Sequence, residues 1–141
     1  DDVMSVVRVE DAWSRDSAEP GLRWLRESDR QLAAEYGLPL VAYEGGQHFT
    51  GSSFTRDVVG PHPRMRELYD ALFESWQAAG GGLFVHFAGL IPRGQNEPGT
   101  EPSYYQSENF GIKELQTQSR AEAPRWDAVL WWMEQIGQLD R

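Results

Sequence analysis

Glu44 is the residue of this sequence best placed to do chemistry, because it ends an apolar run and precedes two glycines. It lies in the stretch LVAYEGGQHFTG, from Leu40 to Gly51. A carboxylate at the depth of a strand end is costly unless it is hydrogen-bonded or used. It can act as a nucleophile, a general base or an anchor for ligand hydroxyls, whereas the structural alternative is an ion pair with a neighbouring arginine. Gly45 and Gly46 allow positive φ and the close approach of another group to the backbone.

Two histidines accompany this carboxylate. His86 lies near the end of a second apolar run, Leu83 to Phe87, and flanks the same face as Glu44 if the two runs are adjacent strands. It can bond a ligand hydroxyl or orient Glu44, or it can be a core histidine that donates to a backbone carbonyl. His48 belongs to the first loop, where a solvated position is the favoured interpretation. A metal site built from Glu44, His48 and His86 lacks tight ligand spacing, so we expect no metal. His62, between two prolines, is expected to start a helix.

The segment after the second run combines amides, carboxylates and tyrosines. Its members include Arg93, Gln95, Asn96, Glu97, Tyr104, Tyr105, Gln106, Glu108 and Asn109. Sugar recognition uses this combination, because hydroxyls take polar partners and ring faces stack on apolar C–H faces. The alternative is a polar, turn-rich excursion whose tyrosines pack back on the domain.

Composition excludes several classes of function. The 141 residues carry a net charge of −9, so most of the surface would repel a phosphate backbone, and nucleic acid is not an expected partner. No apolar run approaches the roughly 20 residues of a membrane helix. The absence of cysteine removes disulfides and thiolate chemistry but leaves the compartment open, with an extracellular or periplasmic location preferred. There is no phosphate-binding glycine loop, G-x-S-x-G elbow or H-E-x-x-H motif, so no cofactor is expected.

Three helices are predicted from apolar periodicity and from end signals. They run from Leu22 to Tyr36, from about Pro63 to Ala79, and from a capping box at Ser119 and Glu122 through Pro124. Met4 to Trp13 is a candidate for a fourth helix. Glycine runs after the first two helices are expected to stop them.

The two short apolar runs, Leu40 to Tyr43 and Leu83 to Phe87, are predicted to be strands. The order helix, strand, helix, strand, helix indicates an α/β fold with parallel strands joined by a right-handed crossover. The runs are almost continuously apolar, which is typical of strands covered on both faces. Long segments leave both strands, at the edge where α/β folds place their sites. Two strands cannot close a core, so further strands from a longer chain, or other copies of this one, are expected to join them.

Three motifs resemble the C-terminal part of a (β/α)8-barrel glycoside hydrolase of the broad retaining clan. They are GLPLVAYEGGQH, GGGLFVHFAGL and NFGIKELQTQSRAEAPRWDAV, and the resemblance covers most of the chain. It implies that residues 1–141 are one unit, the last part of a TIM-type barrel. It also implies that Glu44 matches the nucleophile at the end of the seventh strand, and that Phe87 is nearest to the sugar-contacting aromatic of the eighth.

The resemblance implies a carbohydrate ligand. The candidate sugar-contacting residues are His48, His86, Phe87, Tyr104, Tyr105, Glu108 and Asn109. The family's general acid follows an asparagine on a fourth strand that has no counterpart here, so this chain alone is expected to be inactive. The rival hypothesis is a non-catalytic domain, either a carbohydrate-binding domain or an α/β scaffold that buries its strand edges in a homo-oligomer.

Overall fold

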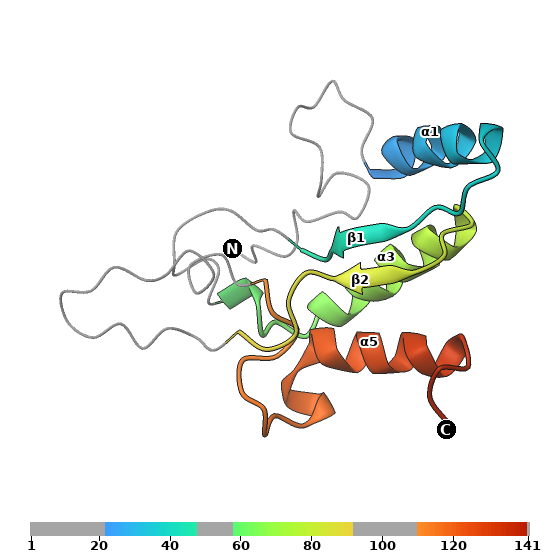
Figure 1. The fold of residues 1–141 in the computed structure, drawn as a ribbon. Coiled ribbons are helices and arrows are strands. Elements are labelled where there is room, and N and C mark those ends of the chain that lie inside the picture. The colour runs from blue at the N-terminus through green and yellow to red at the C-terminus, as the bar shows by residue number, and fades with distance from the viewer. Residues whose placement is uncertain (1–21, 48–57, 92–109, 141) are drawn as a thin grey trace.

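Helices and strands alternate along the part of the chain described by the structure, a computed structural model that covers residues 22–47, 58–91 and 110–140. The order is helix, strand, helix, strand, helix, with a 3-10 turn before the last helix (Figure 1). The predicted α/β class is therefore confirmed. The candidate helix from Met4 to Trp13 lies outside the described residues. None of the helices within these ranges is long and apolar enough to cross a membrane.

The helices begin and end close to their predicted limits. They are α1 (Leu22–Glu35), α3 (Met65–Ala78) and α5 (Pro124–Gln135). Gly37 ends α1 with a φ of 64°, and the next N–H, that of Leu38, donates to the carbonyl of Ala33 at 2.9 Å. This left-handed stop requires glycine, as the sequence indicated.

The predicted capping box forms, but on a shorter element than expected. Ser119 donates twice to Oε2 of Glu122, from its N–H at 2.8 Å and from its hydroxyl at 2.7 Å. The pair closes the 3-10 turn η2 (Arg120–Glu122), and α5 begins only at Pro124. Backbone and side-chain bonds from Ser119 lower the pKa of Glu122.

The sheet has two parallel strands, β1 (Ala42–Gly45) and β2 (Phe84–His86), as predicted. The chain crosses from one to the other through α3 (Figure 1). Ala42 pairs with Phe84 and Gly45 pairs with His86, so β1 has one more residue than β2 over this stretch. This irregularity is a bulge at the carboxyl end of the sheet, and a bulge changes the direction of nearby side chains.

The core lies where α3 and α5 meet beneath the sheet. Its buried cluster contains Val59, Met65, Tyr69, Phe73, Ile112 and Ala128. Phe73 stacks on Trp132, with ring centroids 5.3 Å apart, and meets Phe84 of β2 edge-on at 5.4 Å. Trp131 turns away from this cluster and lies under the guanidinium of Arg66, 5.2 Å from its ring centroid. The adjacent side chains of Trp131 and Trp132 therefore point in different directions.

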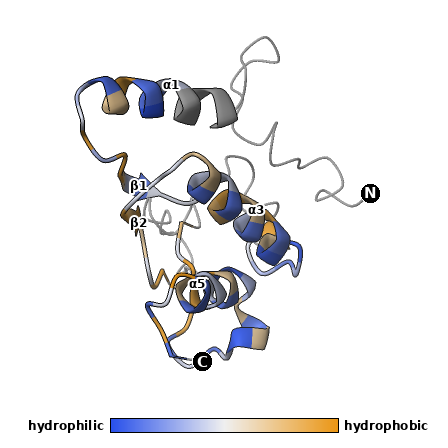
Figure 2. Ribbon diagram, turned by 90° about the vertical axis from the view of Figure 1, so that its right-hand side faces the viewer, coloured by the Kyte–Doolittle hydropathy of each residue, from blue (hydrophilic) through white to orange (hydrophobic). Residues whose placement is uncertain are grey.

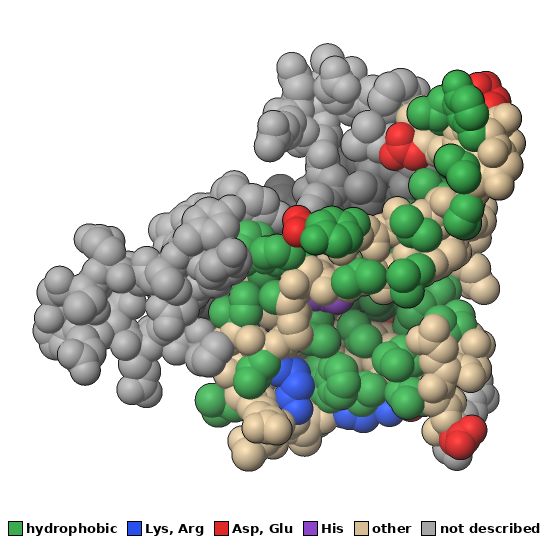
Figure 3. Space-filling view, viewed as in Figure 1, with side chains coloured by type: hydrophobic (Ala, Val, Ile, Leu, Met, Phe, Trp, Pro, Cys, Tyr) green, Lys and Arg blue, Asp and Glu red, His purple; other side chains and the backbone are tan. Residues whose placement is uncertain are grey.

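The opposite face of the sheet is apolar and exposed, contrary to the expectation that both faces are covered. Helices α3 and α5 lie on one side of the strands in two views (Figures 1 and 2). On the other side Val41, Tyr43, Leu83 and Val85 are exposed, and Tyr43 is 81% exposed. Figure 3 shows apolar side chains gathered over the strands on this face. Within the described residues, no element covers this face as α3 covers the other.

Candidate site at the carboxyl ends of the strands

Glu44 lies inside β1 and is exposed, which corrects the sequence interpretation in two ways. The carboxylate does not follow the strand but is its third residue, and it is not at a buried depth. The bulge between Ala42 and Gly45 is the reason, because it makes both Tyr43 and Glu44 exposed instead of alternating them between faces. The carboxylate is therefore available to a ligand at the carboxyl end of the sheet.

Gly45 and Gly46 permit close packing between the two strand ends, as predicted. A Cβ on Gly45 would lie 2.2 Å from the ring of Phe84, and a Cβ on Gly46 would lie 2.5 Å from Nε2 of His86. Gly46 also has a φ of 119°, which L side chains rarely adopt. The side chains of Phe84 and His86 therefore pack directly against the backbone that follows Glu44.

His86 has a hydrogen-bond partner for each ring nitrogen. Its Nδ1 lies 2.8 Å from the carbonyl oxygen of Ala88, and its Nε2 lies 2.6 Å from the hydroxyl of Tyr69. Burial lowers the pKa of His86 to about 4; the Ala88 carbonyl opposes this shift and the charge of Arg125 adds to it. The imidazole is therefore neutral near pH 7.

Tyr69 and Gln47 complete a polar cluster that the sequence patterns did not reveal. The Tyr69 hydroxyl bonds Oε1 of Gln47 as well as His86, and Gln47 is only 5% exposed. Burial raises the pKa of Tyr69, so its proton is retained. Tyr69 lies among the buried, mostly apolar residues of α3. A tyrosine in such a stripe signals a buried hydroxyl that needs a partner, although it does not identify that partner.

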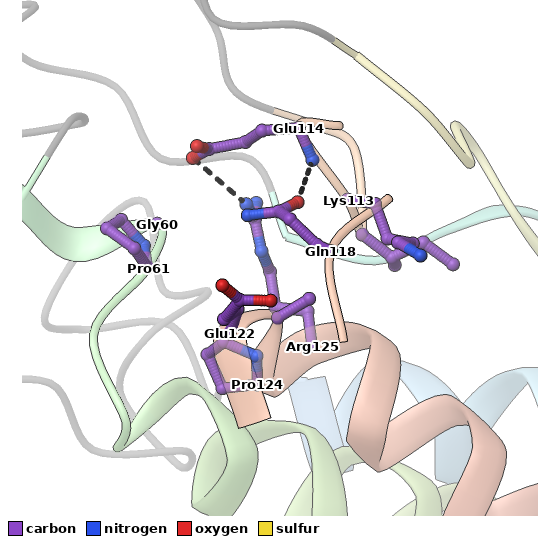
Figure 4. Close-up of a pocket in the computed structure, with 10 residues that line it drawn as sticks. Gly60, Pro61, Lys113, Glu114, Gln118, Glu122, Pro124 and Arg125 are labelled. Atoms are coloured by element: carbon purple, nitrogen blue, oxygen red, sulfur yellow. Dashed lines mark hydrogen bonds and ion pairs between the residues drawn. The ribbon is translucent and has the colours of Figure 1, made fainter. Parts of the chain in front are cut away.

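Arg125, at the start of α5, is a buried charge that acts on the pKa values of Tyr69 and His86. It is 3% exposed, and its Nη2 lies 4.0 Å from Oε1 of Glu114, which points toward it (Figure 4). The N–H of Glu114 donates to Oε1 of Gln118 at 2.8 Å. These residues line a pocket with room for little more than a water molecule, too small for a sugar ring. Glu44 and His86 do not line it, so the candidate site is the open strand edge and not this pocket.

Phe87, the predicted aromatic contact, lies immediately after β2. Its N–H donates to the carbonyl of Gly45 at 2.9 Å, which fixes it beside the end of β1. Its ring meets that of Phe110 edge-on, with centroids 5.0 Å apart, and the residue remains 37% exposed. One part of the ring is therefore supported by protein and another part faces solvent.

Several predicted residues lie outside the described ranges. They are His48, Tyr104, Tyr105, Glu108 and Asn109. The structure places Glu44, His86 and Phe87 at the same end of the sheet and leaves these five as predictions. Among residues 22–47, 58–91 and 110–140, no three acidic or histidine side chains are grouped to hold a metal ion. His62 lies three residues before α3 begins, and its Nδ1 accepts the N–H of Arg64 at 3.2 Å.

No protein-family model, no curated protein and no solved structure matches this chain. The resemblance to retaining glycoside hydrolases therefore rests on the three motifs alone. What the structure adds independently is a small α/β arrangement of three helices and a two-stranded parallel sheet within the described residues.

Proposed function

We propose that this chain forms the last units of a (β/α)8 barrel that acts on carbohydrate, with Glu44 as nucleophile or sugar-anchoring carboxylate. The observation that supports this function is an exposed carboxylate and a partly exposed aromatic ring on neighbouring strand ends. Glu44 precedes Gly45, whose carbonyl accepts the N–H of Phe87 at 2.9 Å. A carboxylate accepts hydrogen bonds from sugar hydroxyls, while a ring face packs on the sugar C–H groups. Parallel α/β barrels place their sites at this edge.

The exposed apolar face of the sheet supports the barrel part of the proposal. Tyr43 on β1 and Val85 on β2 are exposed, and so are Val41 and Leu83 directly before the two strands, although strands rich in such residues are normally buried. In a barrel these side chains would face the interior and pack against the other strands. The missing partner of this face is then the remainder of the barrel.

The reaction requires a second carboxyl group. In retaining glycosidases one carboxylate attacks the anomeric carbon while a carboxylic acid roughly 5 Å away gives its proton to the departing oxygen. Glu44 has the first role in this proposal. The family's general acid belongs to a strand not represented in this sequence, so the chain on its own is expected to give no turnover.

The proposal is tested in the full-length gene product that carries this sequence. Turnover of aryl glycosides and oligosaccharides is compared between the native protein, Glu44→Gln and the control Glu74→Gln, which changes an exposed carboxylate on α3. We expect Glu44→Gln to lose at least about a thousandfold in kcat, as expected when a nucleophile is removed, while Glu74→Gln retains full turnover. Undiminished turnover of a folded Glu44→Gln protein would remove the nucleophile role.

A non-catalytic, self-assembling scaffold is the second candidate, and the same exposed face favours it. Copies of the chain could bury Val41, Tyr43 and Val85 against one another, since exposed apolar patches mark association sites. Sedimentation separates the candidates. A discrete dimer or tetramer that dissociates on Val85→Glu, but not on Leu115→Glu at an exposed turn, supports the scaffold. A monomer supports the barrel.

A further inference from the structure

Tyr69 is bonded to residues of both strand ends, although it belongs to neither strand. It projects from α3, is only 2% exposed, and bonds Gln47 just after β1 and His86 at the end of β2. The separation from His86 Nε2 is 2.6 Å. One hydroxyl on the helix beneath the sheet therefore holds both strands at the edge where Glu44 lies.

The ring of Tyr69 would fill its place without the hydroxyl. It packs edge-on against Phe73 at 5.9 Å and stacks on His86 at 5.8 Å, contacts that a phenylalanine would also make. The hydroxyl therefore contributes directional hydrogen bonds, whereas the ring alone fills the space. Fully bonded buried polar groups fix one arrangement of a core, because leaving a partner unbonded is costly.

The bonding pattern of this cluster is that of neutral groups. The Nδ1 of His86 lies 2.8 Å from the Ala88 carbonyl, which can only accept, so Nδ1 carries the imidazole proton. The Tyr69 hydroxyl has one proton to donate and lies between two partners, Nε2 of His86 and Oε1 of Gln47.

The cluster is connected to Glu44 through two glycines. His86 lies against the backbone of Gly46, where a Cβ would come within 2.5 Å of its Nε2. Gly45 is tied to β2 by the bond from the Phe87 N–H at 2.9 Å. Movement of His86 or Gln47 would therefore displace the backbone directly after Glu44.

We propose that Tyr69 is a positioning residue, whose bonds to Gln47 and His86 hold the carboxyl end of β1 and so fix the place of Glu44. The contacts above support the positioning role of Tyr69, while the importance of that role for binding a sugar rests on the proposed function. Tyr69 itself does not touch the reacting atoms in this account.

Hydrogen exchange of two amides in the sheet tests the proposal. The Phe87 N–H bonds Gly45 at the carboxyl end, and the Ala42 N–H bonds Leu83 at the opposite end, each at 2.9 Å. In Tyr69→Phe we expect exchange at Phe87 to accelerate roughly tenfold, the factor that 1.4 kcal/mol produces, while Ala42 changes less than about twofold. Gln47→Met should give the same pattern, and Tyr36→Phe, at an exposed tyrosine, should change neither amide.

Equal acceleration at Ala42 and Phe87 would overturn the proposal, because it would mean that the hydroxyl only stabilises the whole fold. Unchanged exchange at Phe87 would overturn it too. Both exchange measurements are made without a sugar ligand, so they test the positioning role of Tyr69 independently of the proposed function. If the exchange pattern is found but Glu44→Gln leaves turnover intact, the proposed function fails while the positioning role of Tyr69 stands.

Discussion

Gly46 lies against the imidazole of His86, so closely that a Cβ on Gly46 would stand 2.5 Å from Nε2. The backbone directly after β1 therefore packs against a side chain at the end of β2. The contact occurs two residues after Glu44, at the edge that carries the candidate site. Space and backbone conformation together require glycine at this position.

Replacing Gly46 by alanine is expected to destabilise the fold strongly. The left-handed φ of 119° adds strain, and the new methyl group would collide with His86, for a loss of roughly 2–6 kcal/mol. Gly37→Ala is the matched control, because Gly37 has a φ of 64° but nothing within 4 Å of its Cβ position; its cost should be roughly 1–2 kcal/mol. Urea unfolding followed by tryptophan fluorescence measures both. Equal losses would show that the contact with His86 is not tight.

The partly buried, neutral state of His86 predicts a dependence of stability on pH. Its pKa is lowered to about 4 in the folded chain, chiefly by burial, from the ordinary value of 6.5. Between these values the unfolded chain binds a proton that the folded chain does not. Stability is therefore full above about pH 6.5 and falls as the pH drops toward 4, by up to roughly 3 kcal/mol from this group.

Urea unfolding at several pH values checks this slope. His86→Gln removes the titrating group while keeping a polar side chain. We expect the native chain to lose more stability than His86→Gln between pH 6.5 and 4. Parallel curves would show that burial does not lower the pKa of His86 in the folded chain.

Asp127 joins α3 to the turn before α5 through two arginines. Its carboxylate pairs with Arg66 of α3 and accepts from Nε of Arg120 at 2.5 Å. The three side chains are partly exposed, so Asp127→Asn should cost only about 1 kcal/mol, and less in 1 M salt. Asp140→Asn, at an exposed position near the C-terminus, is the control and should cost nothing measurable. A large loss of unfolding free energy that does not change with salt would show that these two ion pairs are not screened by solvent.

Much of the fold could be predicted from the sequence, because local signals determine it. Glycines at 37 and 80 stop α1 and α3 with positive φ, and the apolar stripe of α3 is buried as its periodicity indicates. Parallel pairing followed from two short apolar runs separated by a helix. These features are determined by residues close together in sequence, so they can be read from one sequence.

The details of the site depend on residues far apart in sequence, and prediction was weaker there. Nothing in the sequence marks the bulge that makes Glu44 exposed, because a bulge depends on the register between two strands. Nor does spacing reveal that Tyr69 meets Gln47, 22 positions earlier, and His86, 17 positions later. The uncovered sheet face was not predicted. Apolar runs indicate that both faces of a strand are buried, but they do not identify the element that covers each face.

Glu44 and Phe87 are proposed to contact the same sugar ligand, and NMR titration of this chain tests this most directly. The carboxyl ¹³C signal of Glu44 and the ring signals of Phe87 are followed while cello-, xylo- and manno-oligosaccharides are added. We predict saturable shifts of both signals with one of these sugars, at a Kd of about 1 mM, roughly −4 kcal/mol. Glu44→Gln should abolish binding without changing the free energy of unfolding by more than about 0.5 kcal/mol, because the side chain is exposed. Signals of Glu44 and Phe87 that do not move with any of the three sugars would contradict the account.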